Sequence, residues 1–458
     1  MKFSFRLSLL FLAALVLAGC TNPAASSPSG TSDGSGESET ETNHTDVPSF
    51  QPPEMPEPAE AVTWDNTFWI AASPDIGLLE SEQYVRDAVK AHAEAGVNLI
   101  LWWAHPALHI DAFLEECERY GVYTILRNNS NITGAAENWN EITEEEFEKT
   151  VAPYKDHPQV LGFENWDEPL HEDVQYTQML WRKEMAQKYF PGKLSFINLC
   201  PSYGPYTWGN GLFTEQVETL LERVDPAVLA VDYYAYSVSG ESPDWTKNFL
   251  WRDLGYLRKR AIETDKPLWF YFQGWDFDKQ ESGMTPVQLR LQMNAGLAYG
   301  CRWLCYWTSK NSVVDITGKP SAQYAEVAAL NTEVMNVGRY LMDKKPGELY
   351  HAGLAAGEKS NATLAATFFC SKIEDSAVFA GLPAAHVILS TFTDDDGHTY
   401  VVAVNRHQTE SVQDTVELKS PRSIFQLDAA TGETSAVGQA DSLSLELAPG
   451  ALQLFILE

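Results

Sequence analysis

The feature that most limits what this chain can fold into is a regular alternation of segments between Trp64 and Lys345. Short apolar runs rich in β-branched and aromatic residues, typical of buried strands, alternate with amphipathic segments of helical period. Strict alternation predicts a parallel sheet, and eight units predict its closure into a (β/α)8 barrel over residues 61–345. The predicted strands are Phe68–Ser73, Val97–Trp103, Val122–Arg127, Val160–Trp166, Leu194–Leu199, Val228–Tyr234, Leu268–Gln273 and Arg302–Trp307.

Helical segments separate these strands, and several of them end at a glycine. Gly96, Gly121 and Gly300 each follow such a segment, where a C-terminal cap needs the left-handed backbone that glycine adopts easily. An open doubly wound sheet is the alternative architecture, but no Gly-rich dinucleotide turn follows the first strand. The predicted helices are Ser81–Ala95, Ile110–Tyr120, Glu144–Tyr154, His171–Tyr189, Phe213–Val224, Lys247–Thr264, Pro286–Tyr299 and Ala322–Met342.

Residues 346–458 follow a different pattern. Short runs of alternating hydrophobicity, separated by turn residues such as Asp394–Gly397, replace the helical segments. This pattern predicts a small all-β sandwich. Its strand candidates include Ala362–Phe369, Tyr400–Asn405, Thr415–Leu418 and Leu452–Leu457.

The N-terminus carries a signal for export. Lys2 and Arg6 precede the apolar run Leu7–Leu17, which is too short to cross a bilayer and fits a signal-peptide core. The run leads into Leu-Ala-Gly-Cys at Cys20, which resembles the bacterial lipoprotein box. The resemblance implies removal of residues 1–19, lipidation of Cys20 and anchoring at the extracellular face of the bacterial membrane. An ordinary secretory peptide is the alternative.

Residues 20–60 are dominated by Ser, Thr, Gly, Pro and Glu and contain no Lys or Arg, so they predict an acidic tether without a core. The whole chain has a formal net charge of -31, from 63 Asp and Glu against 32 Lys and Arg. This charge repels phosphate backbones and argues against nucleic-acid binding.

The cysteines show neither a disulfide pattern nor metal-ligand spacing. Cys301 and Cys305 lie about 13 Å apart at strand rise, too far for a disulfide. The pattern predicts neither a metal site nor a cofactor. We expect buried apolar thiols at Cys117, Cys200, Cys301, Cys305 and Cys370.

Candidate catalytic residues lie where the fourth strand ends, because barrels of this type place their active sites at the C-terminal ends of the strands. Alternation with period two puts Glu164, Trp166 and Glu168 on one face and Asp167 on the other. Glu168, at the rim beside Trp166 and Pro169, is expected to be partly desolvated, which favours the neutral form of a general acid. The alternative is a structural acidic residue near the start of the next helix.

The run Trp166–Pro169, Trp-Asp-Glu-Pro, resembles the signature of the large β-galactosidase-like clan of (β/α)8 glycoside hydrolases. The segments Gln288–Gly300, Trp303–Trp307 and Ala448–Ile456 are similar to the same group, so the resemblance covers nearly all of the chain after the tether. It implies hydrolysis of O-glycosidic bonds in a carbohydrate substrate, with Glu168 as the acid/base. It does not indicate the sugar, the linkage or the stereochemical outcome.

The sequence departs from this clan at the end of strand seven, where the clan has a nucleophilic glutamate. The matching residue here is Gln273, and an amide cannot form the glycosyl-enzyme ester. Asp232, at the end of strand six, is the first candidate for the second carboxylate, as nucleophile or base. A structural aspartate bonded to a neighbouring Tyr or Arg is its alternative. Further candidates in the loop after strand seven are Asp276, Asp278 and Glu281.

Two other hypotheses tolerate Gln273. One is a carbohydrate-binding lipoprotein on a barrel that has lost catalysis. The other rests on the acidic end of strand four and the Asp232–Tyr234 end of strand six, which resemble substrate-assisted glycosidases acting on N-acetylhexosamines. There the acetamido oxygen of the sugar attacks, so that no enzymic nucleophile is required. The acidic DxxDxDxE run of the best-known such family is absent.

Half of the fourteen tryptophans fall at or just beyond predicted strand ends. Indole rings stack on the apolar faces of pyranoses, while amides and carboxylates bind hydroxyl groups. For any single tryptophan, core packing is the alternative. The chain is therefore predicted to be a surface-anchored glycoside hydrolase. Its predicted substrate-binding residues are Trp103, His105, Asn128, Trp166, Asp167, Tyr234, Gln273, Trp275, Trp307 and Lys310.

Overall fold

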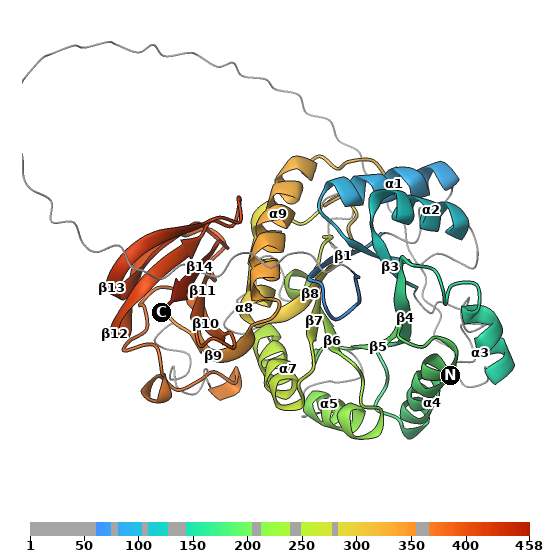
Figure 1. The fold of residues 1–458 in the computed structure, drawn as a ribbon, viewed down its shortest axis with the longest axis horizontal. Coiled ribbons are helices and arrows are strands. Elements are labelled where there is room, and N and C mark those ends of the chain that lie inside the picture. Colours follow the sequence, from blue (N-terminus) through green and yellow to red (C-terminus); the bar gives the residue numbers. More distant parts are fainter. Residues whose placement is uncertain are drawn as a thin grey trace, which may run out of the picture. The chain divides into compact units, whose positions relative to one another are not determined.

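The computed structural model describes residues 61–74, 81–102, 109–126, 143–203, 212–238, 249–276, 283–353 and 366–458. All of them belong to one compact unit, Pro48–Glu458. Eight parallel strands close into a barrel in the order β1 to β8, with helices around it (Figure 1). The predicted (β/α)8 barrel followed by an all-β region is confirmed. The barrel strands are β1 (Trp69–Ser73), β2 (Leu99–Trp102), β3 (Tyr123–Leu126), β4 (Val160–Asp167), β5 (Leu194–Leu199), β6 (Leu229–Tyr233), β7 (Leu268–Gln273) and β8 (Cys301–Trp307).

Local signals account for several helix ends. Thr143 and Thr285 each form a capping box with the Glu or Gln three residues later. Gly96, Gly121 and Gly300 have positive φ, as their predicted cap positions require. None of the described helices is both long enough and apolar enough to cross a membrane. The helices are α1 (Glu82–Glu94), α2 (Ile110–Tyr120), α3 (Glu144–Val151), α4 (Asp173–Tyr189), α5 (Leu212–Arg223), α6 (Ala235–Val238), α7 (Leu250–Thr264), α8 (Pro286–Ala298) and α9 (Tyr324–Leu341).

An aromatic floor fills the barrel below its C-terminal rim. The ring centroids of Trp269 and Trp303 are 4.0 Å apart, and the ring of Phe196 lies 5.5 Å from both. These side chains come from alternate strand positions and belong to a core that also contains Trp69 and Tyr271. Because this interior is packed, a ligand site on the barrel lies above it, among the residues that follow the strands.

Strand β4 contains a bulge that reverses the direction of its side chains. Glu164 pairs with Phe196 and Trp166 pairs with Ile197, so that Asn165 is an extra residue with no partner on β5. Phe196 belongs to the interior core, whereas Ile197 belongs to the outer core under the helices. The alternation of inward and outward side chains therefore changes phase at Asn165.

This change of phase moves two predicted site residues to opposite faces. Trp166 faces α4, where the Arg182 guanidinium lies 5.0 Å from its ring centroid, and its side chain is only 6% exposed. Asp167 faces the interior, in register with Asn198. The prediction that put Trp166 on the face of Glu168 and Asp167 on the other face is wrong, because strict alternation has no place for an inserted residue.

The C-terminal region is a six-stranded antiparallel sheet of order β13-β12-β14-β11-β10-β9. One face, with Ile388, Val402 and Ile456, shares a hydrophobic core with the barrel, and α8 packs against β10 and β11. The other face buries Leu389 and Val401 in a second core together with side chains of the long β12–β13 hairpin. These two layers support the predicted sandwich. Its strands are β9 (Lys345–His351), β10 (Val387–Thr393), β11 (Thr399–Asn405), β12 (Val412–Leu427), β13 (Thr434–Leu447) and β14 (Leu452–Leu457).

One predicted strand, Ala362–Phe369, is wrong in its described part. Residues 366–369 form a helical turn and a tight turn instead. Phe368 lies in the barrel core, and the ring of Phe369 is 5.3 Å from that of Tyr256 on α7. These apolar residues are therefore buried by packing against a helix, which the sequence pattern does not distinguish from burial in a sheet.

The junction of barrel and sheet contains a hydrogen-bonded polar network. Arg406 donates to His351 Nδ1 at 2.6 Å and to the Ala352 oxygen at 3.1 Å, while His351 Nε2 bonds the Tyr299 hydroxyl at 2.8 Å. Arginine can only donate, so Nδ1 of His351 is an acceptor and Nε2 carries its proton. Burial lowers the pKa of His351 well below its usual range, which keeps the ring neutral.

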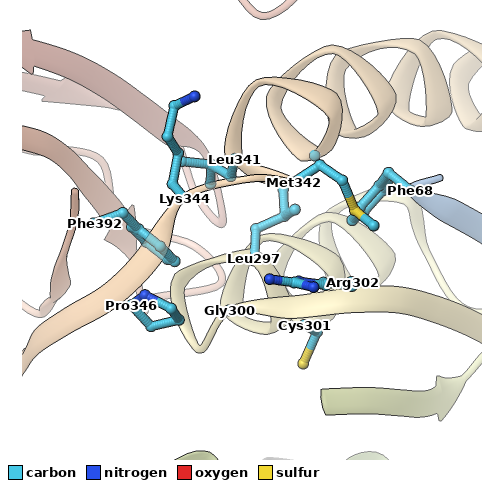
Figure 2. Close-up of a pocket in the computed structure, with 11 residues that line it drawn as sticks. Phe68, Leu297, Gly300, Cys301, Arg302, Leu341, Met342, Lys344, Pro346 and Phe392 are labelled. Carbon is cyan, nitrogen blue, oxygen red and sulfur yellow. The ribbon is translucent and has the colours of Figure 1, made fainter. Parts of the chain in front are cut away.

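A small crevice lies at the same junction, at the N-terminal end of the barrel strands (Figure 2). Phe68 and Arg302 contribute from the starts of β1 and β8, Met342 from the end of α9, and Phe392 from β10. This end of a (β/α)8 barrel serves stability, whereas the opposite end carries the functional residues.

Candidate active site

The C-terminal ends of β4, β5 and β6 gather three carboxyl groups around one amide. Asp167 is in register with Asn198, and Asn198 with Ala230, two residues before Asp232. Asn198 Nδ2 donates to Asp167 Oδ1 at 3.0 Å and to Asp232 Oδ1 at 3.3 Å. The Asn198 backbone oxygen accepts the Glu168 N–H at 2.9 Å. Asp167, Glu168 and Asp232 therefore form one acidic cluster at the rim.

Glu168 occupies this cluster in a strained backbone conformation. Its φ of 45° lies in the left-handed region, which costs a non-glycine residue roughly 1–2 kcal/mol. The bond to Asn198 holds it there. Its half-buried carboxyl accepts hydrogen bonds from the Cys200 thiol and the Asp232 carboxyl. Such strain is typical of functional sites, where surrounding contacts fix a side chain in the position that the chemistry needs.

Asp232 holds the proton of the cluster. Its side chain is 2% exposed, and burial raises its pKa well above the usual range. The charges of Glu168 and Asp167 raise the pKa further, against the opposing effect of the hydrogen bond from the Tyr234 hydroxyl. Two ionised carboxylates cannot hydrogen-bond to each other, so the contact between Asp232 and Glu168 favours a proton on Asp232.

Half-buried aromatic rings border the acidic cluster. Tyr234 and Trp307 stack with their centroids 6.4 Å apart and their planes at 24°. The Tyr203 hydroxyl accepts the Tyr234 N–H at 2.9 Å. Burial raises the pKa of both tyrosines, so their hydroxyls stay protonated. The rim thus combines apolar ring faces with hydroxyl and carboxyl groups, the combination that carbohydrate rings require.

Gln273 lies at the end of β7, as predicted, but its amide is used by the backbone. Its side chain is 1% exposed; Oε1 accepts the Tyr236 N–H at 2.9 Å, and Nε2 donates to the Trp275 oxygen at 3.0 Å. The amide therefore connects the start of α6 with the segment that follows β7. There the Lys310 ammonium lies 4.7 Å from the centroid of the Trp275 ring, over its face.

A buried histidine supports the loop after β8. His92 Nδ1 lies 2.6 Å from the Ala88 oxygen and Nε2 lies 2.8 Å from Ser309 Oγ. A carbonyl only accepts, so Nδ1 carries the proton and Nε2 accepts from the Ser309 hydroxyl. Burial lowers the pKa of His92 to about 4, which keeps the ring neutral. This pair anchors the chain between Trp307 and Lys310 to α1.

Several predicted residues fall outside the described residues. They are Cys20, Trp103, His105, Asn128, Asp278 and Glu281. Asp276 is half-buried just after Trp275. The structure therefore brings together Asp167, Glu168, Asp232, Tyr234 and Trp307, with Trp275 and Lys310 on neighbouring loops, and it places Trp166 under a helix.

Sequence reasoning missed three residues beside the acidic cluster: Asn198, Cys200 and Tyr203. Asn198 and Cys200 stand two residues apart where β5 ends, so the rule that located Glu168 also applies to them. Cys200 is buried as predicted, yet its thiol contacts Glu168, and burial together with three nearby carboxyls raises its pKa. Cys200 gave no signal because cysteine is common in protein cores, and Asn198 gave none because its partners lie on other strands.

One set of side chains has metal-ligand spacing in the described part of the chain: Asp394, Asp396 and His398. It lies in the turn between β10 and β11, not at the barrel rim. Asp394 Oδ2 is bonded within the turn by His398 Nδ1 at 2.8 Å and by the Tyr400 hydroxyl at 2.7 Å. These bonds are sufficient to explain the cluster as a turn.

Comparison with known proteins finds no matching family model and no matching curated protein. Solved structures do match. One is a provisionally assigned α-galactosidase from Bacteroides fragilis, with 11% identity, a TM-score of 0.51 and coverage of 86% of this chain and 79% of that one. Another, from the same organism, is provisionally assigned as an α-galactosidase/melibiase, with 11% identity, a TM-score of 0.51 and coverage of 86% and 80%. At this identity the likeness shows a shared (β/α)8 fold.

Proposed function

We propose that this protein is a glycoside hydrolase whose chemistry rests on Asp167, Glu168 and Asp232. The observation that carries the proposal is the gathering of Asp167, Glu168 and the buried Asp232 around Asn198 at the C-terminal rim of the barrel, where burial and the neighbouring acids raise the pKa of Asp232. A neutral carboxyl beside further carboxyls is the arrangement that general acid catalysis of glycosidic cleavage requires. The fold of the two Bacteroides fragilis proteins supports the same class of reaction.

In this proposal Glu168 delivers the proton to the departing glycosidic oxygen, because it is the more exposed member of the pair. Asp232 supplies that proton through their hydrogen bond. The Asp167 and Asp232 oxygens share one donor nitrogen at 3.0 and 3.3 Å and so lie less than about 6.5 Å apart.

A panel of oligosaccharides incubated with the purified protein and its Glu168→Gln variant tests the proposal. Turnover of unactivated substrates should fall by about 10²–10⁴-fold in the variant, because it lacks the general acid. Glu172→Gln, at an exposed position before α4 with no side-chain cap bond, is the matched control and should turn over normally. Full activity of Glu168→Gln would refute the assignment, and glycan binding without release by the parent protein would favour a carbohydrate-binding lipoprotein.

Substrate-assisted hydrolysis is a second candidate. It is favoured because neither Asp232 nor Gln273 is well suited to act as a nucleophile. Asp232 retains its proton, and the amide of Gln273 is engaged by backbone groups. A substrate whose own acetamido oxygen attacks would need neither residue as a nucleophile. Paired aryl glycosides that differ only in carrying a 2-acetamido or a 2-hydroxy group decide between the two candidates. Cleavage of the acetamido member alone supports substrate assistance, and equal cleavage of both rejects it.

We also propose that the protein is lipid-anchored through Cys20 at the extracellular face of the bacterial membrane. The basic start, the apolar run and the Leu-Ala-Gly-Cys ending support this. Labelling of producing cells with a clickable fatty acid should mark the protein and leave a Cys20→Ser variant unmarked. Equal labelling of both proteins would contradict the anchor.

A further inference from the structure

We propose that Asn198 is a positioning residue of this site. Its amide nitrogen holds the carboxyls of Asp167 and Asp232 at a fixed spacing and stabilises negative charge on them. This inference rests on the proposed function and names a residue for which the family resemblance offers no role. Asn198 touches all three acidic residues: its amide nitrogen bonds Asp167 and Asp232, and its backbone oxygen accepts the N–H of Glu168.

The side chain of Asn198 serves the carboxyl pair and nothing else among the described residues. It is 4% exposed, and its two N–H groups point to one carboxyl each, at 3.0 and 3.3 Å. Its Oδ1 is buried and has no hydrogen-bond partner in the described part of the chain. The amide therefore acts through its donor side alone, toward the two carboxyls.

The orientation of the amide follows from the charges it meets. An amide oxygen turned toward Asp167 and Asp232 would place three acceptors together and leave both N–H groups without their carboxylate partners. With the nitrogen toward the pair, each carboxyl receives one donor, which stabilises negative charge between two acids held less than about 6.5 Å apart. Asn198 thereby offsets the repulsion that its position between β4 and β6 would otherwise impose.

The other groups next to Asp167 and Asp232 do not replace the Asn198 amide as a donor to both carboxyls. Glu168 from β4 adds a further carboxyl, and the Cys200 thiol bonds Glu168. The Tyr234 hydroxyl bonds Asp232, and Tyr203 bonds the backbone of Tyr234. Among these neighbours, only the amide of Asn198 bonds both Asp167 and Asp232, so its removal should take this donor from both carboxyls.

Two variants separate positioning from simple packing. Asn198→Ala removes the donor at every pH, and Asn198→Asp keeps the shape but can donate only when the new carboxyl is protonated. We expect the ionisation midpoint of Asp232, followed by carbon-13 NMR of labelled aspartates, to rise by about one to two pH units in Asn198→Ala, because hydrogen bonds to charged groups contribute about 1.5–3 kcal/mol. This measurement needs no substrate.

The pH profile of kcat/KM gives the second measurement. Asn198→Asp should lose turnover at neutral pH and regain it as the pH falls, while Asn198→Ala should not recover. Asn294→Asp is the matched control, since that buried amide bonds the Gly450 oxygen at 2.9 Å at the junction with the sheet. Its profile should keep the parent shape.

The outcomes keep the two proposals apart. Unchanged aspartate titrations in both Asn198 variants would overturn the positioning role even if Glu168→Gln abolishes turnover. Shifted titrations in a protein that cleaves no glycan would support the role of Asn198 and count against the hydrolase. If Asn198→Ala does not fold, the acid recovery of Asn198→Asp still decides the question, because a packing defect in Asn198 variants would lower turnover equally at all pH values.

Discussion

The acidic cluster at the barrel rim and the polar network at the barrel–sheet junction are built in opposite ways. At the junction, Arg406, His351 and Tyr299 form a chain in which a donor meets an acceptor at each step. At the rim, three acids lie together, and burial with the charges of Glu168 and Asp167 raises the pKa of Asp232. Complementary groups stabilise a fold, whereas like groups held together lower its stability and create reactivity.

The difference teaches where to look for function in this molecule. Buried polar groups that satisfy one another are explained by the fold alone. The rim departs from the usual rules twice, with a left-handed Glu168 and a buried Asp232 whose pKa is raised. Such departures are expected at functional sites, where stability is given up for chemistry. Variants of the two regions should therefore have opposite effects on activity and stability.

The largest expected effect is at Asp232. Asp232→Asn keeps the shape and the hydrogen bonds but removes the proton that the acid pair shares, so turnover should fall by about 10²–10⁴-fold. The raised pKa means that the folded state binds this proton more tightly than the unfolded chain does. Stability therefore declines as the pH rises from the ordinary aspartate pKa to the raised pKa of the folded state. The variant should therefore have a higher thermal midpoint at neutral pH, measured by calorimetry. A lower midpoint would contradict the comparison.

Asp253 provides a matched Asp→Asn change outside the cluster. It accepts the Ser202 N–H at 2.9 Å, and burial raises its pKa to about 6. Because the folded pKa lies above the unfolded value, the stability present below about pH 4 is lost as the pH rises to 6, by at most about 3 kcal/mol. Asp253→Asn should flatten this part of the stability–pH curve and retain turnover. Parallel curves for variant and parent would reject the assignment.

A junction variant should show the reverse pattern. His351→Phe keeps a ring in place but leaves the buried Arg406 guanidinium without its acceptor at 2.6 Å. The free energy of unfolding, from urea titration, should fall by about 2 kcal/mol. Turnover measured well below the unfolding midpoint should be unchanged. Tyr299→Phe, which removes only the hydroxyl, should lose less, and a large loss of turnover in either variant would break the distinction between the regions.

The smallest expected effect is at the edge of the site. Lys310→Met removes the ammonium that lies 4.7 Å from the Trp275 ring centroid but keeps most of the side-chain length. A cation–π contact at a half-exposed position contributes about 0.5–1 kcal/mol, so KM for a neutral glycan should rise by no more than about fivefold. The thermal midpoint should fall by no more than a few degrees. An effect on kcat as large as that of Asp232→Asn would place Lys310 in the chemistry itself.

The course of the chain was predictable from local signals, because strand and helix patterns and glycine caps depend on near neighbours in sequence. The site was predictable only in part. Glu168 and Asp232 could be located from strand ends, but their mutual hydrogen bond joins residues on β4 and β6. Asn198 was not predicted as a site residue, because its role depends on two hydrogen-bond partners on other strands. Trp166 was misplaced because one inserted residue, Asn165, reverses every later side chain.

The alternating strands and helices, the closed parallel barrel and the β-region after it were therefore predictable from the sequence alone. The acidic residues available at the rim were predictable as well. Those properties follow from periodicity and composition, which are summed over many residues and tolerate local exceptions. Three features came from the three-dimensional contacts instead: the raised pKa of Asp232, the turn of Trp166 toward the helices after the inserted Asn165, and the position of the Asn198 amide between Asp167 and Asp232. These depend on burial and on contacts of a few ångströms between residues distant in sequence, and a single bulge is enough to change them.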